Sequence, residues 1–433
     1  MAQAKLALAD EAGPPYHPCM VQSKRLALVL AGGAARGAYE VGVVDYIARE
    51  VSKSVGRDVR FDILCGTSVG ALNACGLAAY AHEGKDAALR LVDVWTKLQI
   101  SELVQTDMRA MLGFGRRLLG RGSLADVAVR ESGILDATGL ERLIERSVPF
   151  KNITKNIDAG LIHALTVSTT HVASGKTVVY VQRKGLTIPH WSLDPTIIPR
   201  PVEIAAEHAL ASAAIPILFR AVRLGREYHC DGGLRQNVPL SPARRLGADS
   251  VIVINPRHID GAGLGGSPET DEDFPGPFTL LGKTLNALLL DRIDTDLARL
   301  ESINRILDAG TRAYGIEFTS ALNLALGNGP GRGMKKMNAI LVRASEDMGK
   351  LAAGFVQSSA FARVQGVTGR VLRHVAERGN ASNEADLLSY LLFDGEFAGQ
   401  LIELGRKDAR ARHEELCAFV ESHHDEPRAS GAS

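Results

Sequence analysis

A serine set between small residues is the clearest candidate for chemistry in this sequence. Gly66-Thr67-Ser68-Val69-Gly70 matches the pattern G-x-S-x-G, in which small neighbours let a strand turn sharply into a helix and leave the hydroxyl exposed. The mostly apolar residues 61–65 precede the serine turn, and residues 70–81 suit a helix. The dipole at a helix N-terminus would favour developing negative charge. Ser68 is therefore a candidate nucleophile, with a simple helix cap as the alternative.

A glycine-rich turn is the second candidate, because it can gather backbone N–H groups around one point. The apolar residues 26–31 lead into Gly32-Gly33-Ala34-Ala35-Arg36-Gly37, and a helical pattern follows. A strand, a turn and a helix N-terminus in this order bind negative charge. One interpretation is a nucleotide phosphate site with a degenerate dinucleotide fingerprint. The other is an oxyanion hole made by the Gly33 and Ala34 amides.

The positions of nearby acidic residues favour the oxyanion hole. A dinucleotide site needs an acidic residue at the end of the second strand. The nearest candidates, Asp58 and Asp62, stand before or at the start of that strand, which instead ends at Ser68. A loop of amide donors and a serine thus follow two successive strands.

The elements that would position these groups alternate between strands and helices. Strands are expected at residues 26–31, 61–65, 163–168, 177–181 and 250–254, and the first helices at residues 39–50 and 70–81. Continuous apolar strands are typical of a parallel sheet that is buried on both faces. The sequence therefore predicts an α/β fold, whose ligands bind at the carboxyl ends of the strands.

Asp231-Gly232-Gly233 adds a third motif, which on its own usually marks a turn. In chain order, the glycine loop ending in Arg-Gly, the G-x-S-x-G pattern and Asp-Gly-Gly resemble the signatures of the patatin-like phospholipases, over residues 26 to about 256. Ala211-Ser212-Ala213-Ala214-Ile215-Pro216, with Phe219 beyond it, is similar to the family segment that precedes the Asp motif. Residues 386–394 are similar to the helical tail of some bacterial members.

The resemblance implies a patatin-like three-layer fold with a mostly parallel central sheet, followed by a helical C-terminal region. It also implies a serine lipid acyl hydrolase, of the phospholipase or carboxylic ester hydrolase type, that works through an acyl-enzyme. Ser68 would be the nucleophile and Asp231 its base. The oxyanion would be held by the loop of Gly32, Gly33, Ala34, Arg36 and Gly37, and the supporting turns would be shaped by Gly66, Gly70, Gly232 and Gly233. Family members often have glycine at the position of Ala34, so the alanine could narrow the approach to the acyl carbonyl.

A dyad without histidine needs a carboxylate that is more basic than usual. An Asp of ordinary pKa, about 3.9, is a weak base for a hydroxyl, so burial between Cys230 and Leu234 would have to raise the pKa of Asp231. A triad is the alternative. The α/β-hydrolase order would require a later histidine such as His258, whereas His229 is expected to be a structural neighbour of Asp231.

Composition narrows the classes of partner. The chain has 433 residues, 45% hydrophobic and 23% charged, and its 50 basic and 49 acidic residues leave a net charge of +1. This balance predicts no nucleic-acid partner. Five scattered cysteines without metal-ligand spacing predict a reduced interior with no metal, and no cofactor is expected. Residues 1–25 lack a secretory pattern, and the uncharged residues 63–81 suit a buried strand and helix, so we expect a cytoplasmic protein without a transmembrane helix.

Two segments could meet a lipid surface, which would make the protein peripheral to a membrane. One is a Gly-rich loop between Glu317 and Glu346, a stretch without acidic residues that carries Arg332, Lys335, Lys336 and Arg343. Basic groups of this kind can attract anionic headgroups, although a solvated loop is the simpler interpretation. Residues 109–119 combine basic and apolar side chains, as a lid, an interfacial helix or a buried connecting helix would.

Composition also suggests five segments along the chain. An N-terminal extension covers residues 1–24, the patatin-like catalytic domain 25–258, and a linker or surface loop rich in Gly, Pro and acidic residues 259–277. A helical C-terminal region covers residues 278–421, because leucines and isoleucines recur on one helical face, and a disordered tail covers 422–433. Two functions remain as alternatives to the hydrolase: a nucleotide- or phosphate-binding protein, and a non-catalytic scaffold.

Overall fold

The computed structural model describes ten stretches of the chain. These are residues 24–100, 105–106, 135–136, 138–188, 191, 194–216, 218–259, 293–327, 333–364 and 388–425. Residues 1–23 of the expected extension, residues 260–277 of the expected linker, the lid candidate at residues 109–119 and residues 426–433 of the expected tail lie outside the described residues.

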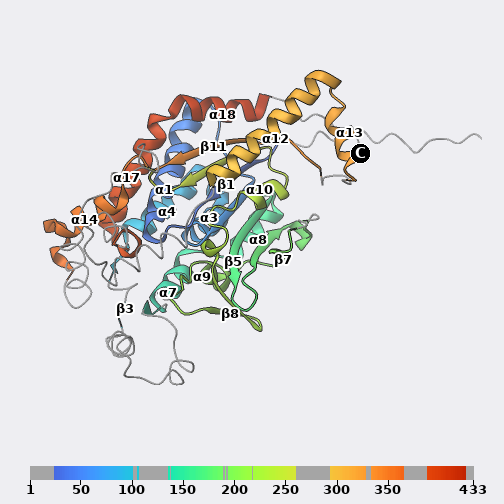
Figure 1. Ribbon diagram of the computed structural model, residues 1–433. Coiled ribbons are helices and arrows are strands. Elements are labelled where there is room, and N and C mark those ends of the chain that lie inside the picture. Colours follow the sequence, from blue (N-terminus) through green and yellow to red (C-terminus); the bar gives the residue numbers. More distant parts are fainter. Residues whose placement is uncertain are drawn as a thin grey trace, which may run out of the picture.

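A mostly parallel sheet forms the centre of the molecule, with helices on both faces (Figure 1). Within the described residues it has nine strands, in the order β11-β10-β1-β2-β5-β6-β7, with β9 paired to β5 and β8 to β9. Their bounds are β1 Leu26–Leu30, β2 Ile63–Thr67, β5 Ala164–His171, β6 Thr177–Arg183, β7 Ile197–Pro201, β8 Val222–Leu224, β9 Glu227–Asp231, β10 Ser250–Asn255 and β11 Asn338–Arg343. A small separate pair joins β3 Gln105–Thr106 to β4 Leu135–Asp136. Strands β11, β10, β1, β2 and β5 are mutually parallel, as predicted for buried apolar runs.

Alternating strand residues divide the core into two layers. On β1, Leu26, Leu28 and Leu30 pack toward one group of helices, whereas Ala27 and Val29 pack toward the other. The first group comprises α1 Gly37–Tyr46, α3 Val69–Ala79, α4 Ala87–Thr96, α7 Thr138–Ser147, α8 Lys151–Asp158, α9 Ala206–Ser212, α14 Met348–Gln357 and α17 Gly395–Ala411. The second comprises α10 Leu240–Arg245 and α12 Ile293–Tyr314. Helix α18 His413–Asp425 also packs in the first layer, through Leu416 and Val420. The described residues further include the short helices α2 Ser52–Ser54 and α13 Phe318–Ala325 and a helical turn at residues 388–391. The predicted three-layer α/β arrangement is confirmed.

The C-terminal region is mainly helical, but it also supplies a strand that the sequence analysis did not anticipate. Strand β11 pairs in parallel with β10 and extends the sheet. Its apolar run, residues 339–342, is too short for periodicity to distinguish a strand from a helix. Helix α18 continues to Asp425, inside the segment expected to be a disordered tail.

Helix α17 crosses α1 so closely that glycines are needed on both sides. A Cβ on Gly42 would overlap the carbonyl oxygen of Ile402, and a Cβ on Gly405 would overlap the backbone of α1. Beside this crossing, Arg406 pairs with the buried Asp45, with 2.6 Å between Nη2 and Oδ2. Helix α17 is thereby fixed to α1, the helix that follows the glycine loop (Figure 1).

Candidate active site

Ser68 stands between β2 and α3 in an unusual backbone conformation. Its φ of +56° and ψ of −128° lie outside the regions that residues with a side chain normally adopt. Small neighbours make this turn possible, since a Cβ on Gly66 would overlap the backbone of α3 and a Cβ on Gly70 would press on the carbonyl oxygens at the end of β1. The turn predicted from G-x-S-x-G is present. The hydroxyl was expected to be exposed, but Ser68 is only 2% exposed because the glycine loop and the Asp231 turn lie against it.

Strand β5 explains why residues so distant in sequence meet. Strand β2 pairs with β5 as far as Thr67, which lies opposite Ser168. The antiparallel strand β9 pairs with the next residues of β5, and its last residue, Asp231, lies opposite Thr169. Because β6 occupies the other edge of β5 at Thr169, β2 and β9 follow one another along the same edge. The end of β2 and the end of β9 are therefore adjacent, and each carries its functional side chain there.

The Ser68 hydroxyl donates a hydrogen bond to Oδ2 of Asp231, with 2.6 Å between the two oxygens. Oδ1 of the same carboxylate accepts the Gly233 amide at 2.7 Å. Asp231 is 1% exposed, and this burial raises its pKa from 3.8 to about 7, although the bonds from Ser68 and Gly233 limit the rise. A carboxylate of that pKa is a far better proton acceptor than an ordinary Asp.

Ser212, at the end of α9, supports the serine turn from behind. Its hydroxyl accepts the Ser68 backbone N–H at 2.9 Å and donates to the Ser168 carbonyl at 2.6 Å. It therefore bridges the turn after β2 to strand β5. Sequence reasoning assigned no role to Ser212, although the family-like segment that contains it was a usable signal.

The glycine loop lies against this serine turn. A Cβ on Gly32 would come within 3.0 Å of the Ser68 Cβ, and a Cβ on Gly37 would press on Val69. Within the described residues, the Gly33 and Ala34 amides have no hydrogen-bond acceptor. Ala34 has a left-handed φ of +49°, a conformation that favours glycine.

Asn237 ties the loop to the Asp231 turn. Its backbone carbonyl accepts the Gly32 N–H at 3.2 Å, and its side-chain amide donates to the Gly32 carbonyl at 3.4 Å. The turn that carries the carboxylate therefore also fixes the start of the loop. Sequence reasoning did not single out Asn237.

A buried polar cluster lies behind the loop, and the sequence analysis did not find it. Glu40 on α1 is fully buried, and its Oε2 accepts the Asn73 side-chain amide at 2.9 Å. Asn73 also donates to the Gly37 carbonyl and accepts the Trp95 indole N–H, each at 3.0 Å. Burial raises the pKa of Glu40 well above its ordinary value, although the Asn73 bond opposes the rise. Asn73 therefore links Glu40 and Trp95 to the last residue of the glycine loop.

The histidine alternatives do not meet Asp231. His229 Nδ1 lies 3.0 Å from the Thr169 hydroxyl, and its Nε2 lies 3.3 Å from the Tyr180 hydroxyl. His258 Nδ1 lies 3.1 Å from the Ala344 carbonyl. Among the described residues, the Asp231 carboxylate has only the Ser68 hydroxyl and the Gly233 amide as hydrogen-bond partners.

The nucleotide interpretation also lacks its acidic partner. Asp62 accepts the Leu26 N–H at the amino ends of β2 and β1, which is the end of the sheet opposite the glycine loop. In the part of the chain that the structure describes, no three His, Cys, Asp or Glu side chains gather as a metal site would require.

The basic groups proposed for lipid contact are engaged with carboxylates. Lys335 pairs with Asp249, Lys336 with Asp308 and Arg343 with Asp294, at 2.5, 3.0 and 2.7 Å. Arg332 lies outside the described residues. These pairs weaken the case for a free basic surface. None of the helices placed by the structure combines the length and the apolar character needed to cross a membrane.

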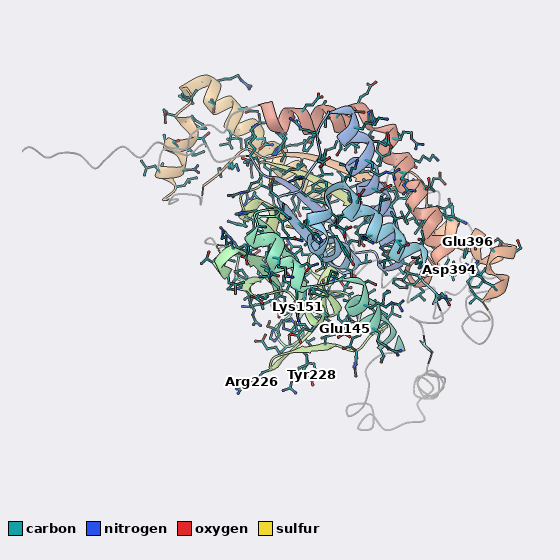
Figure 2. All side chains as sticks on the ribbon, turned by 180° about the vertical axis from the view of Figure 1, so that it is seen from behind. Glu145, Lys151, Arg226, Tyr228, Asp394 and Glu396 are labelled. Atoms are coloured by element: carbon teal, nitrogen blue, oxygen red, sulfur yellow. The ribbon has the colours of Figure 1, made fainter. Side chains whose placement is uncertain are left out.

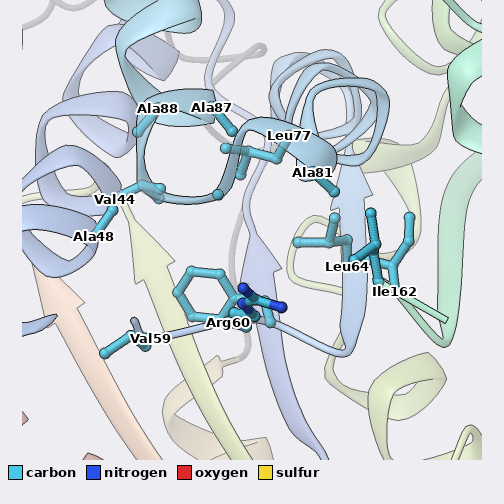
Figure 3. A pocket seen from close by; sticks show the side chains of 13 residues that line it. Val44, Ala48, Val59, Arg60, Leu64, Leu77, Ala81, Ala87, Ala88 and Ile162 are labelled. Atoms are coloured by element: carbon cyan, nitrogen blue, oxygen red, sulfur yellow. The ribbon is translucent and has the colours of Figure 1, made fainter. Parts of the chain in front are cut away.

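An apolar pocket near Arg60 is distinct from the serine site (Figure 3). Its walls include Leu64 at the start of β2 and Leu77 near the end of α3, so it opens at the end of the sheet opposite Ser68. Its volume of about 60 Å³ is well below the ~300–1,000 Å³ typical of ligand pockets. This pocket therefore does not define the site of chemistry.

An α/β sheet with a serine turn, a buried carboxylate and a glycine loop at the carboxyl ends of its strands defines a hydrolase-like class of protein. The chain belongs to the patatin-like phospholipase family, whose sequence profile matches residues 28–244. It is 27% identical over 228 residues to a "cGAMP-activated phospholipase" of Pseudomonas aeruginosa. The alignment covers 52% of this chain and 55% of that relative, so the chain spans about half of the relative's length.

Two solved structures also resemble the chain. VipD from Legionella pneumophila shares 14% identity at a TM-score of 0.30, over 88% of this chain and 67% of VipD. Human GIVD cytosolic phospholipase A2, solved with methyl gamma-linolenyl fluorophosphonate, shares 12% identity at a TM-score of 0.38, over 92% of this chain and 59% of that one.

Proposed function

We propose that this protein is a serine lipid acyl hydrolase that cleaves phospholipid carboxylic esters. The observation that carries the proposal is the 2.6 Å hydrogen bond from Ser68 to a fully buried Asp231 whose pKa is raised to about 7. Family membership and the name of the Pseudomonas relative support phospholipids as the substrate class.

The first half-reaction would form an acyl-enzyme. Ser68 Oγ attacks the ester carbonyl while Asp231 Oδ2 accepts the hydroxyl proton. The oxyanion of the tetrahedral intermediate would accept the Gly33 and Ala34 amides, which have no acceptor among the described residues. The intermediate collapses as the lysolipid alkoxide leaves, and that alkoxide takes the proton from Asp231.

The second half-reaction would regenerate the enzyme. A water molecule attacks the acyl carbonyl and gives one proton to Asp231. The serine oxygen then leaves and recovers that proton, and the fatty acid is released. Because each oxyanion-hole donor is typically worth about 10²–10³ in turnover, the glycine loop would carry much of the rate enhancement.

Activity assays with three purified variants test this function. On phosphatidylcholine vesicles and on p-nitrophenyl butyrate, Ser68→Ala and Asp231→Asn should each lower kcat by about 10³-fold or more. Ser422→Ala, the same change at an exposed position on α18, is the control and should match wild type. Full activity of Ser68→Ala or Asp231→Asn would refute the dyad.

A fluorophosphonate label separates catalysis from the alternatives. Wild type should be labelled and Ser68→Ala should not, because only an activated serine reacts. An unlabelled wild type that binds nucleotide in calorimetry would instead be a binding protein. A wild type that is neither labelled nor able to bind nucleotide would support the scaffold alternative.

A further inference from the structure

Arg36 belongs to the glycine loop, but its side chain is buried in the C-terminal region. Its Nε donates to the hydroxyl of Ser389 at 2.8 Å, across 353 positions of sequence. Its guanidinium carbon lies 4.0 Å from the centre of the Tyr390 ring. With 6% of the residue exposed, the guanidinium stacks on this ring and is enclosed by protein rather than presented to solvent.

The backbone of Arg36 holds the peptide that carries one of the proposed oxyanion donors. Its N–H donates to the Gly33 carbonyl at 3.0 Å. In a trans peptide the C=O and the next N–H point in opposite directions, and the described residues contain no cis peptide bond. The position of Arg36 therefore sets the plane of the peptide between Gly33 and Ala34, and with it the direction of the Ala34 N–H.

The conformation of this peptide requires support from outside the loop. Ala34 has a φ of +49°, which L-residues with a side chain rarely adopt. The anchored side chain of Arg36 supplies that support two residues further on.

The C-terminal anchor is itself firmly placed. Ser389 is fully buried and Tyr390 is 5% exposed. The same segment leads into α17, where Asp394 caps the helix by accepting the amides of Glu396 and Phe397. Figure 2 labels Asp394 and Glu396 at this end of the helix. An anchor of this kind transmits position, because a buried, capped segment has few alternative conformations.

We infer that the C-terminal segment of residues 388–390 positions the oxyanion loop through Arg36. This inference rests on the proposed hydrolase function. Arg36 is a positioning residue: it acts on the Ala34 amide and does not bind the substrate. The geometry of the oxyanion hole consequently depends on a segment that lies outside the matched family region, residues 28–244.

A double-mutant cycle tests the coupling. Its members are Arg36→Met, Ser389→Ala and the combination, assayed on p-nitrophenyl butyrate and on phosphatidylcholine vesicles. Arg36→Met should lower kcat by about 10- to 100-fold on both substrates with KM within about twofold, because an oxyanion donor acts only in the transition state. Ser389→Ala should lower kcat by roughly 3- to 10-fold, and the double variant should be no slower than Arg36→Met. Arg36→Lys, which keeps a charged donor, should recover part of the loss.

Arg406→Met is the control for a general loss of stability. It removes from α17 the shorter of the two ion pairs of buried Asp45 and leaves the pair with Arg49, so Tm should fall while kcat stays at the wild-type value. An equal loss of kcat in this variant would overturn the inference. If Arg36→Met does not fold, Ser389→Ala decides alone, and an unchanged kcat refutes the coupling.

The two substrates distinguish the remaining outcomes. A loss confined to phosphatidylcholine, with a raised KM, would make Arg36 a phosphate ligand and overturn the positioning role. Full kcat of Arg36→Met beside an active wild type refutes this inference alone. A wild type inactive on both substrates refutes the proposed function, and the inference with it.

Discussion

The pKa of Asp231 makes a prediction about stability that does not depend on knowing the substrate. The folded protein holds this carboxyl at a pKa of about 7, against an ordinary value of 3.8. Between these two values the folded state keeps a proton that the unfolded state has lost. The stability contributed by the raised pKa is therefore fully present below about pH 4 and is lost as pH rises through 7.

The Asp231→Asn substitution should remove this pH dependence. The amide keeps an acceptor for the Gly233 N–H and can donate to the Ser68 oxygen, so the local contacts survive. One unit of pKa corresponds to about 1.4 kcal/mol, so the two units between pH 5 and 7 correspond to roughly 3 kcal/mol. Relative to wild type, the variant should gain about 3 kcal/mol in unfolding free energy between pH 5 and pH 8.

Urea unfolding of both proteins at several pH values measures this difference. In parallel, kcat/KM of wild type on p-nitrophenyl butyrate should rise about tenfold per pH unit below 7 and level off above it, because the ionised carboxylate is the base. Two stability curves that stay parallel from pH 5 to 8 would show that Asp231 has an ordinary pKa. The account of its basicity by burial would then be wrong.

Three further substitutions address the surroundings of the site. Ser212→Ala removes the acceptor of the Ser68 N–H and should lower unfolding free energy by about 1–3 kcal/mol in urea titration, with kcat reduced as the serine turn relaxes. Glu40→Gln should become more stable relative to wild type as pH rises. Burial raises the pKa of Glu40, so the folded wild type holds a proton that the unfolded chain has released, and its unfolding free energy falls as pH rises. Thermal unfolding at several pH values measures this difference. Ala34→Gly should raise unfolding free energy by up to about 1 kcal/mol, since glycine adopts a φ of +49° without strain, and an unchanged or lower Tm would contradict this.

The parallel core of the fold could be predicted because its signals are local. Residues 26–31 and 250–254 are continuous apolar runs, and they appear as β1 and β10. The G-x-S-x-G turn could be predicted for the same reason, since close packing leaves no room for a side chain at Gly66 or Gly70. Strand β11 was missed because four apolar residues carry too little periodicity to identify an element.

The contacts around the site depend on tertiary pairing and could not be found in this way. Nothing in one sequence indicates that Asp231 and Thr67 would face adjacent residues of β5. The same holds for the hydrogen bond from Arg36 to Ser389 and for the burial of Glu40, which only the assembled layers create. The ion pairs of the basic segment could not be predicted either, because a partner such as Asp249 lies far from Lys335 in sequence.

The addition of β11 to the sheet limits how the chain can be shortened. A fragment ending at residue 259 would lack β11, so the backbone N–H and C=O groups along one edge of β10 would have no partner strand. Every residue of β10 is buried in the full chain. The shortening would also strip α17 from α1 and expose the apolar side chains beneath it. Unprotected edges of this kind pair with other chains, so such a fragment should aggregate instead of yielding a minimal enzyme.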